Sequence, residues 1–441
     1  MPVRAPLTFQ QRWLLELVQK YPLWHCAAGY TFNIQGELDL ELLQRNVVEV
    51  VRRHGSLRTR IMLVDGCAEQ LIDDSGVFRL EVIRVTGRSP MEIERNALRV
   101  AESIYDLRFD PFVAPPWSIT VLRLSDREHW LILVMHRLIA ECASIERVFQ
   151  EIRALYEEQS YGKPSAFSPS PPQYSDYAWA QQKNAAEWFD RHEGYWNKRL
   201  ADATGVCWPS DAELLKVERS TLGKTSCPLG GELSTKLHDL ARTHRTLSPT
   251  LMLAVYVVTL WRWCGQTDFV VPFNVAGRQS EHRPVVGFFA YALFLRIGFS
   301  ESATFLEVVD QIGKEFYRAL SHQDFGRVAV RRPDLIAGTL FQWITWHPDD
   351  VARASASSLV DTEGLSVSRL PIRDFGQGLT VAPPSVVDVE VTLFDAPEGL
   401  CALGTYRADR FASATIQRFM DDFRDNAQAL LHNPRDSIAL R

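Results

Sequence analysis

Residues 136–142 read His-Arg-Leu-Ile-Ala-Glu-Cys and bring several reactive side-chain types close together. Histidine suits proton transfer, because its ordinary pKa lies near working pH. Arg137 stays protonated, so it cannot act as a general base, but it can stabilise an oxyanion or bind a carboxylate. A helix start would activate Cys142, yet no base is identifiable beside it in the sequence. We therefore interpret His136 as a support for the motif's shape and Cys142 as an inert thiol.

The flanking sequence predicts the elements that hold this motif. Residues 117–124 and 130–135 have the composition of strands, with a polar turn at 126–128 between them. Residues 145–155 have the apolar spacing of a helix. The motif is therefore expected in the connection between a strand and the helix that follows it.

Helices and strands alternate along the rest of the chain. Residues 60–64 and 68–72 flank Asp65 and Gly66, which predicts a hairpin. Apolar spacing also predicts helices at 7–18, 38–54, 90–101, 179–199, 233–244, 249–264, 304–320 and 414–431, and strands at 30–34, 268–275, 292–297, 387–394 and 400–406. Residues 159–173 are rich in proline and serine and are the best candidate for a linker.

Length and charge limit the classes of protein. The chain has 441 residues, and single cores stop growing at roughly 250–300 residues, so two cores are expected. A net charge of −6 offers no basic face for nucleic acid. The most apolar stretch, 251–263, contains Arg262 and is too short to span a bilayer. We therefore expect neither nucleic acid nor a membrane as a partner.

Cysteine usage and the N-terminus indicate the compartment. The seven cysteines are widely spaced, and no pair has the two-residue gap of a zinc or redox motif. The first residues start no apolar run of the kind that a secretory signal contains. These features predict a cytoplasmic protein without a bound metal.

Several short blocks occur in a particular order. They read Leu-Thr-Phe-Gln-Gln-Arg-Trp at 7–13, Arg-His-Gly-Ser-Leu-Arg-Thr-Arg at 53–60, Phe-Asp-Pro at 109–111, the motif at 136–142, Gln-Tyr-Ser-Asp-Tyr-Ala at 173–178, Pro-Phe-Asn-Val-Ala-Gly-Arg at 272–278 and Val-Gly-Phe-Phe at 286–289. In this order the blocks resemble those of condensation domains of nonribosomal peptide synthetases, from about residue 7 to about residue 431. The motif occupies the place of that family's His-His-x-x-x-Asp-Gly. The chain is similar to a stand-alone condensation domain.

The resemblance implies an α/β fold of two chloramphenicol-acetyltransferase-like lobes in a V shape, with a central tunnel. We expect an N-terminal lobe at 1–165, which carries the motif, and a C-terminal lobe at 166–441 with bridging segments. Two carrier proteins would deliver thioester-bound substrates from opposite faces. The candidates for lining the tunnel are His25, Ser144, Tyr291 and Ala292, of which the last two replace the family's asparagine and threonine.

The motif departs from the family pattern at its chemical centre. The second histidine, to which the family assigns the handling of the nucleophile, is Arg137 here. Glu141 replaces the aspartate, and Arg278 matches the arginine of the second lobe with which the resemblance pairs that acid. Cys142 replaces a glycine and adds bulk at the start of the following helix. His54 belongs to a scaffold block, and we assign it a structural role.

Three functions compete. In the first, the protein forms an amide or ester from carrier-bound acyl or peptidyl thioesters by a divergent mechanism. His136 would then orient the motif, Arg137 would stabilise charge, and positioning would supply roughly 7–11 kcal/mol. In the second, the protein is a catalytically degenerate platform, similar to the recruiting domains of glycopeptide assembly lines, which also carry His-Arg. The third is a coenzyme-A-dependent acyltransferase, against which the blocks in both halves argue.

The resemblance also implies partners. No bound cofactor is expected, because the phosphopantetheine arm of a carrier protein would carry the substrate. The expected partners are peptidyl or acyl carrier proteins, with other synthetase modules or a tailoring enzyme as further candidates. Whether the chain is an enzyme stays open at this point.

Overall fold

The structure is a computed structural model of the chain. It describes residues 2–21, 26–74, 78–162, 164, 167, 170–211, 222–322, 331–345, 360–362, 365–370, 387–396 and 399–439. The chain folds into two compact units. The first comprises Met1–Ala185, Gly277–Ala290 and Asp349–Val381, and the second comprises Ala186–Ala276, Tyr291–Pro348 and Ala382–Arg441.

The first unit contains a six-stranded sheet with the strand order β12-β13-β2-β7-β6-β5. These strands are β2 (Ala27–Gly36), β5 (Glu81–Arg84), β6 (Trp117–Arg123), β7 (Glu128–His136), β12 (Val360–Thr362) and β13 (Leu365–Leu370). Its helices are α1 (Phe9–Lys20), α2 (Leu40–Arg53), α3 (Pro90–Tyr105), α4 (Cys142–Tyr161) and α5 (Tyr174–Lys183), with short 3₁₀ turns η1 (Gly55–Arg58) and η2 (Ser280–His282).

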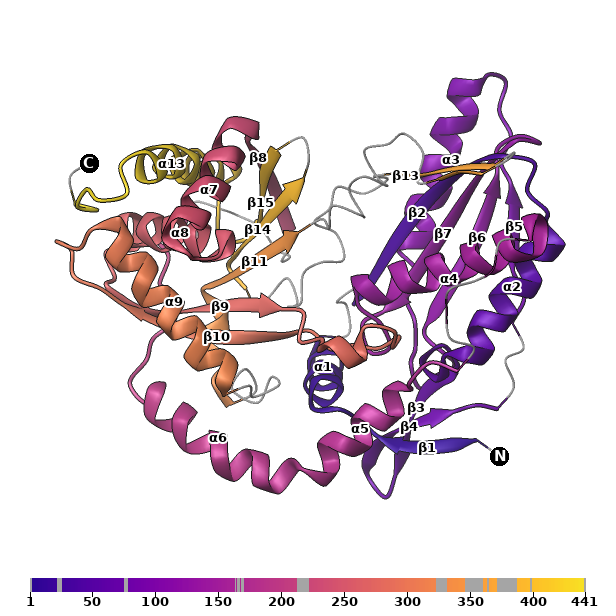
Figure 1. Cartoon of the computed structure of the whole chain (residues 1–441), viewed down its shortest axis with the longest axis horizontal. Coiled ribbons are helices and arrows are strands. Elements are labelled where there is room, and N and C mark those ends of the chain that lie inside the picture. The colour runs from indigo at the N-terminus through magenta and orange to yellow at the C-terminus, as the bar shows by residue number, and fades with distance from the viewer. Residues whose placement is uncertain are drawn as a thin grey trace. The chain divides into compact units, whose positions relative to one another are not determined.

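Strand β7 alternates between two apolar layers, because successive side chains of a strand point to opposite faces. Trp130, Ile132 and Val134 form a buried cluster with residues of α3. Leu131 pairs with Phe32 of β2, whose ring stacks on Phe149 of α4 with ring centroids 3.5 Å apart. The sheet therefore lies between α3 and α4, and the motif leaves it at the end of β7 (Figure 1).

A smaller sheet of the first unit has the order β1-β4-β3, with β1 at Val3–Pro6, β4 at Cys67–Ile72 and β3 at Thr59–Val64. The predicted hairpin between β3 and β4 is confirmed. Asp65 and Gly66 both have positive φ, at 50° and 78°. A two-residue type I′ turn requires this conformation at both positions, and glycine adopts it without strain.

The second unit contains a six-stranded sheet with the order β10-β9-β11-β14-β15-β8. Its strands are β8 (Leu222–Leu229), β9 (Asp268–Val275), β10 (Tyr291–Gly298), β11 (Thr339–Thr345), β14 (Val389–Ala396) and β15 (Gly399–Arg407). Its helices are α6 (Ala185–Arg199), α7 (Gly230–His244), α8 (Ser248–Cys264), α9 (Phe305–Ser321), α11 (Asp334–Ala337) and α13 (Ser413–His432). Figure 1 shows α7, α8 and α13 close to one another beside this sheet.

The units do not coincide with the lobes expected at 1–165 and 166–441, which stay a prediction. Helix α5, and with it the second half of the expected linker at 159–173, belongs to the first unit. So does the segment 277–290, although the chain on both sides of it belongs to the second unit. Side-chain contacts over long sequence separations cause this exchange, and local composition does not record them.

In the part of the chain that the structure describes, no single helix is long and apolar enough to cross a membrane. Helices α7 and α8 meet the criteria of length and composition only as a pair, which is bent by 108°. Residues 250–260 of α8 are buried.

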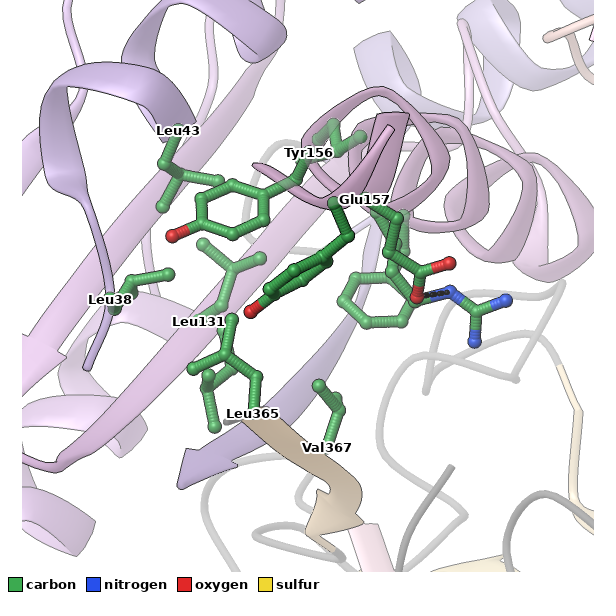
Figure 2. A pocket seen from close by; sticks show the side chains of 12 residues that line it. Leu38, Leu43, Leu131, Tyr156, Glu157, Leu365 and Val367 are labelled. Carbon is green, nitrogen blue, oxygen red and sulfur yellow. Dashed lines mark ion pairs between the residues drawn. The ribbon is translucent and has the colours of Figure 1, made fainter. Parts of the chain in front are cut away.

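A cavity lies in the first unit between α4 and β13 (Figure 2). Its walls are almost wholly apolar and include Leu43, Leu131, Leu365 and Val367. Unfilled space beside buried side chains costs stability, because the lining atoms lose contacts. The cavity therefore offers room for a larger side chain on β13.

Val367→Ile is expected to raise the free energy of unfolding by about 0.8 kcal/mol, because it buries one more methylene group in this cavity. Thermal unfolding measures the change. Val391→Ile is the control, since Val391 is fully buried in β14 and an added methylene there causes overpacking. A melting temperature of Val367→Ile that lies below that of the native chain contradicts the prediction.

Candidate functional site

His136 is the last residue of β7 and pairs with Ala27 of β2. The side chain is buried, and its Nδ1 accepts a hydrogen bond of 3.1 Å from the backbone N–H of Leu138. An accepting Nδ1 places the proton of a neutral imidazole on Nε2. This contact holds the chain in its turn after the strand, which agrees with a role in shaping the motif.

Arg137 follows directly and is buried, with 4% of its surface exposed. Its backbone N–H donates a 2.9 Å hydrogen bond to the carbonyl of Cys26. Burial raises the pKa of the Cys26 thiol to about 12, and the nearby Arg137 guanidinium only partly opposes this. Cys26 is therefore a neutral thiol near neutral pH, and it is no thiolate partner for the arginine.

Glu141 caps the start of α4, but its carboxylate turns to the segment 277–290. Oε1 accepts a 2.9 Å hydrogen bond from Nε of Arg278. Oε2 accepts hydrogen bonds from the backbone N–H groups of Phe289 (3.2 Å) and Ala290 (3.0 Å). The pKa of the Glu141 carboxyl is raised, because the effect of burial is larger than the opposite effect of Arg278 and the two amides.

Arg278 is almost as enclosed as its partner. Nη1 donates to the carbonyls of His282 and Val285, and Nη2 donates to Oγ of Ser144 at 3.1 Å. The guanidinium also lies 4.4 Å from the ring centroid of Phe289. Because the segment that carries Arg278 belongs to the first unit, the ion pair lies within one unit. The expected lobes divide the chain at another place than these units, so the pairing of Glu141 with Arg278 between two lobes stays a prediction.

Ser144 lies in the first turn of α4 and is fully buried. Its hydroxyl donates to the carbonyl of Gly287 at 2.8 Å and accepts from the N–H of Gly287 at 3.0 Å. With the bond from Arg278, its one proton and both lone pairs are engaged. The serine therefore fixes the segment 277–290 and has no capacity left for a substrate.

Tyr174 of α5 fixes the same segment from another side. Its hydroxyl contacts Oγ of Thr8 at 2.9 Å and donates to the carbonyl of Phe288. A Cβ atom on Gly287 would lie 2.1 Å from the Tyr174 ring, so this position has no room for a side chain. The hydroxyl of Ser56 adds a 2.6 Å hydrogen bond to the carbonyl of Val286.

The remaining predicted site residues are distributed differently. Cys142 is the first residue of α4, is half-buried and has a free thiol. Tyr291 and Ala292 begin β10 in the second unit and are both buried. Neighbouring residues of a strand point to opposite faces, so these two cannot line the same wall. His25 lies outside the described residues.

A buried charge cluster was missed by the sequence interpretation. Glu151 of α4 is fully buried, and its carboxylate lies 3.1 Å from Nε2 of His54 and 3.3 Å from Nη2 of Arg53. Arg147, one helical turn earlier, donates to the other carboxylate oxygen at 2.7 Å. The structural role assigned to His54 agrees with this geometry. The signal for Glu151 was an acid four residues after Arg147 that falls in the apolar stripe of the helix, beside Val148 and Ile152.

The described residues contain no group of three or more His, Cys, Asp or Glu side chains that could hold a metal ion. The motif itself supplies one neutral hydrogen-bonded imidazole, one guanidinium and one carboxylate with an arginine partner. These groups can hold a backbone segment and present positive charge. In the described part of the first unit, no side chain of the motif is arranged as a general base. Nδ1 of His136 and the carboxylate of Glu141 already accept hydrogen bonds.

Residues 3–335 match the family model described as Condensation domain. The chain belongs to the condensation domain family. A synthase that contains a similar region is the enniatin synthase of Fusarium equiseti, which is 27% identical over 452 residues. This alignment covers 100% of the chain but 14% of the synthase, and the first four curated relatives are covered over 6–14% of their length.

Solved condensation-type structures share the fold. The X-domain of teicoplanin biosynthesis, in its complex with OxyB, superposes with a TM-score of 0.81 at 20% identity, over 100% of this chain and 96% of that one. The condensation domain of the Monacolin K polyketide synthase MokA superposes with a TM-score of 0.80 at 17% identity, over 99% of both chains. The predicted α/β fold of two lobes is confirmed, while the V shape and the tunnel stay predictions.

Proposed function

We propose that this condensation domain homologue is a binding platform in nonribosomal peptide or hybrid polyketide biosynthesis and does not itself join two substrates. The observation that carries the proposal is the buried guanidinium of Arg137 in place of the family's second histidine. A guanidinium stays protonated at any physiological pH, so it cannot take a proton from an amine or a hydroxyl group.

The neighbouring groups do not replace the missing base. Nδ1 of His136 already accepts a backbone hydrogen bond, and the carboxylate of Glu141 accepts three. A general base must lie within hydrogen-bond reach of the proton that it removes. Glu141 and Ser144 instead hold the segment 277–290 by hydrogen bonds. This supports a scaffold that is retained without the catalytic chemistry of the family.

The partner that we propose is a carrier protein with its substrate on a phosphopantetheine arm. The family membership and the synthases among the relatives support this choice. Such an arm would be the only cofactor and would arrive with the carrier. A tailoring enzyme is the alternative partner, as in the complex of the X-domain with OxyB. These partners would place the protein in the cytoplasm.

A second candidate function is acyl transfer without a base. A positively charged Arg137 in a buried position is suited to stabilise an oxyanion. An amine that is already deprotonated then needs only to be held beside the thioester, and positioning supplies roughly 7–11 kcal/mol. In that mechanism the amine nitrogen bonds to the thioester carbon, and the pantetheine sulfur leaves as a thiol.

Turnover and binding separate the two functions. The full chain is mixed with carrier proteins that bear acetyl, octanoyl or aminoacyl thioesters, and products are measured by mass spectrometry. Under the platform proposal, the native chain forms no amide or ester above the level of a mixture without the chain, and it binds the carrier with the same affinity as Arg137→Ala. Product formation that falls at least tenfold in Arg137→Ala overturns the proposal and supports transfer.

The double variant Arg137→His with Cys142→Gly restores two residue types of the family motif. Gain of amide formation by this variant would support a substrate site that is intact apart from its base. Arg137→Lys is the matched control, because it keeps a positive charge and supplies no imidazole. Equal product from the lysine variant would contradict the assignment of the loss to the missing histidine.

A further inference from the structure

Two histidines of the second unit meet in a place that the proposed function does not use. His192 lies on α6, and His322 follows the last residue of α9. Their Nδ1 atoms are 2.9 Å apart, and the rings are inclined at 77°. The two residues are 130 positions apart in the sequence, so the fold and not the local sequence brings them together.

The 2.9 Å contact between the two Nδ1 atoms requires that at least one of them carries no proton. Burial lowers the pKa of both imidazoles, and the positive charges of His322 and Arg191 lower the pKa of His192 further. Two neutral imidazoles can share one Nδ1 proton, so one nitrogen donates and the other accepts. A neutral ring can bind a metal ion without the loss of a proton from an imidazolium.

His192 retains a second unusual feature. The residue is only 6% exposed, and its Nε2 has no hydrogen-bond partner among the described residues. A buried polar atom without a partner costs free energy. Coordination through Nδ1 places the ring proton on Nε2 and does not remove this cost, but it compensates with a far stronger bond at the other nitrogen.

Aromatic rings hold the two imidazoles in place. Tyr195 stacks on His322 with centroids 3.9 Å apart and an interplanar angle of 5°, and Trp188 lies 4.2 Å from His192. Nε1 of Trp196 donates a 2.6 Å hydrogen bond to the carbonyl of His322. Fixed ligands bind an ion with less loss of side-chain entropy.

Charged groups of both signs lie near the two histidines. His322 lies at the carboxyl end of α9, where the helix dipole favours a cation. Arg191 would repel a cation, but it forms a 2.7 Å ion pair with Glu187. Glu315, which lies near Tyr195, forms a 2.7 Å ion pair with Arg199. The charges near the pair are thus largely balanced.

We propose that His192 and His322 together bind one divalent late transition-metal ion through their Nδ1 atoms. An ion about 2.0–2.1 Å from each nitrogen would form an N–metal–N angle of about 90° at the present separation. That angle suits the tetragonal geometry of Cu²⁺ or Ni²⁺ better than tetrahedral Zn²⁺. Each ring must turn away from its present contact with the other ring so that its Nδ1 lone pair points at the ion, and water fills the remaining coordination positions.

Such an ion would join α6 to the end of α9. Helix α6 follows α5 after a single residue, and α5 belongs to the first unit. The ion would therefore fix the first helix of the second unit to that unit's own core. Binding to the folded state alone raises stability in proportion to the logarithm of the metal concentration.

Separate calorimetric titrations of the full chain with CuCl₂, NiCl₂ and ZnCl₂ at pH 7.5 test the proposal. One ion per chain is expected, with Cu²⁺ bound at least tenfold more tightly than Zn²⁺. His192→Asn and His322→Asn keep a polar group near the position of Nδ1, and each is expected to weaken Cu²⁺ binding at least tenfold. His244→Asn, on α7 of the same unit, is the control and should bind as the native chain does.

Two further measurements distinguish the site from a loss of fold. Electron paramagnetic resonance of the Cu²⁺ complex should show coupling to two imidazole nitrogens, and circular dichroism should show that all variants are folded. The proposal fails if the native chain binds no stoichiometric ion. It also fails if only one of the two asparagine variants loses the ion, because the site requires both rings.

Discussion

Glu141→Ala is expected to lower the free energy of unfolding of the first unit by about 3–5 kcal/mol, the cost of leaving one member of a buried ion pair alone. The substitution leaves the guanidinium of Arg278 without its carboxylate, and it leaves the N–H groups of Phe289 and Ala290 without an acceptor. Both partners of the pair have side chains less than a tenth exposed, so water cannot easily replace the lost contacts.

Urea unfolding followed by tryptophan fluorescence measures this loss. The control is Glu49→Ala, because Glu49 forms a more exposed pair with Arg52 on α2, and such pairs contribute less than about 1 kcal/mol. Glu141→Asp should give an intermediate loss, since an acid shorter by one methylene cannot reach all three donors. An equal effect of Glu141→Ala and Glu49→Ala would show that the buried network does not stabilise the unit.

Glu151→Gln is expected to cost a similar amount, about 3–5 kcal/mol near pH 7, because Arg53 and Arg147 lose a buried counter-charge. Burial alone would raise the pKa of Glu151, but His54, Arg147 and Arg53 together hold it below its ordinary value of 4.5. The folded state therefore favours the charged carboxylate more than the unfolded state does.

The sign of the pH dependence follows from that lowered pKa. The stabilisation by Glu151 is fully present above the unfolded pKa, and it is lost as the pH falls through the lower folded pKa. Unfolding experiments should thus show a gap in the free energy of unfolding between the native chain and Glu151→Gln. This gap is constant at neutral pH and shrinks below about pH 4.5. Glu157→Gln is the control, because Glu157 forms a half-buried pair with Arg153 on the same helix. This variant should show a small gap. A gap for Glu151→Gln that widens in acid would refute the assignment.

Local patterns predicted the elements well, since they depend on neighbours in the sequence. The pair Asp65 and Gly66 specified the hairpin between β3 and β4, because few residues accept positive φ. The strand before the motif and the helix after it were also predicted correctly, as β7 and α4. The order of short blocks indicated the family, which the match of residues 3–335 confirms.

Contacts between distant residues could not be predicted in the same way. Glu141 meets Arg278 across 137 positions, and His54 meets Glu151 across 97. Neither separation follows from the period of a helix or a strand, so the sequence alone does not indicate these contacts. The sequence named three members of these clusters from their block positions, but it could not assign the segment 277–290 to the first unit. The strand predicted at 292–297 began one residue after the start of β10, so the prediction did not place Tyr291 and Ala292 on opposite faces of one strand.

The segment 277–290 has a consequence for how such proteins can be recombined. Consider a chimera in which residues 1–165 come from a relative and the rest from this chain. The relative would supply the residues at the positions of Glu141 and Ser144, whereas this chain would supply Arg278 and the amide donors that bind them. Any breakpoint between Glu141 and Ala290 divides this network. The piece that evolution or an engineer can exchange intact therefore extends well beyond the first half of the gene.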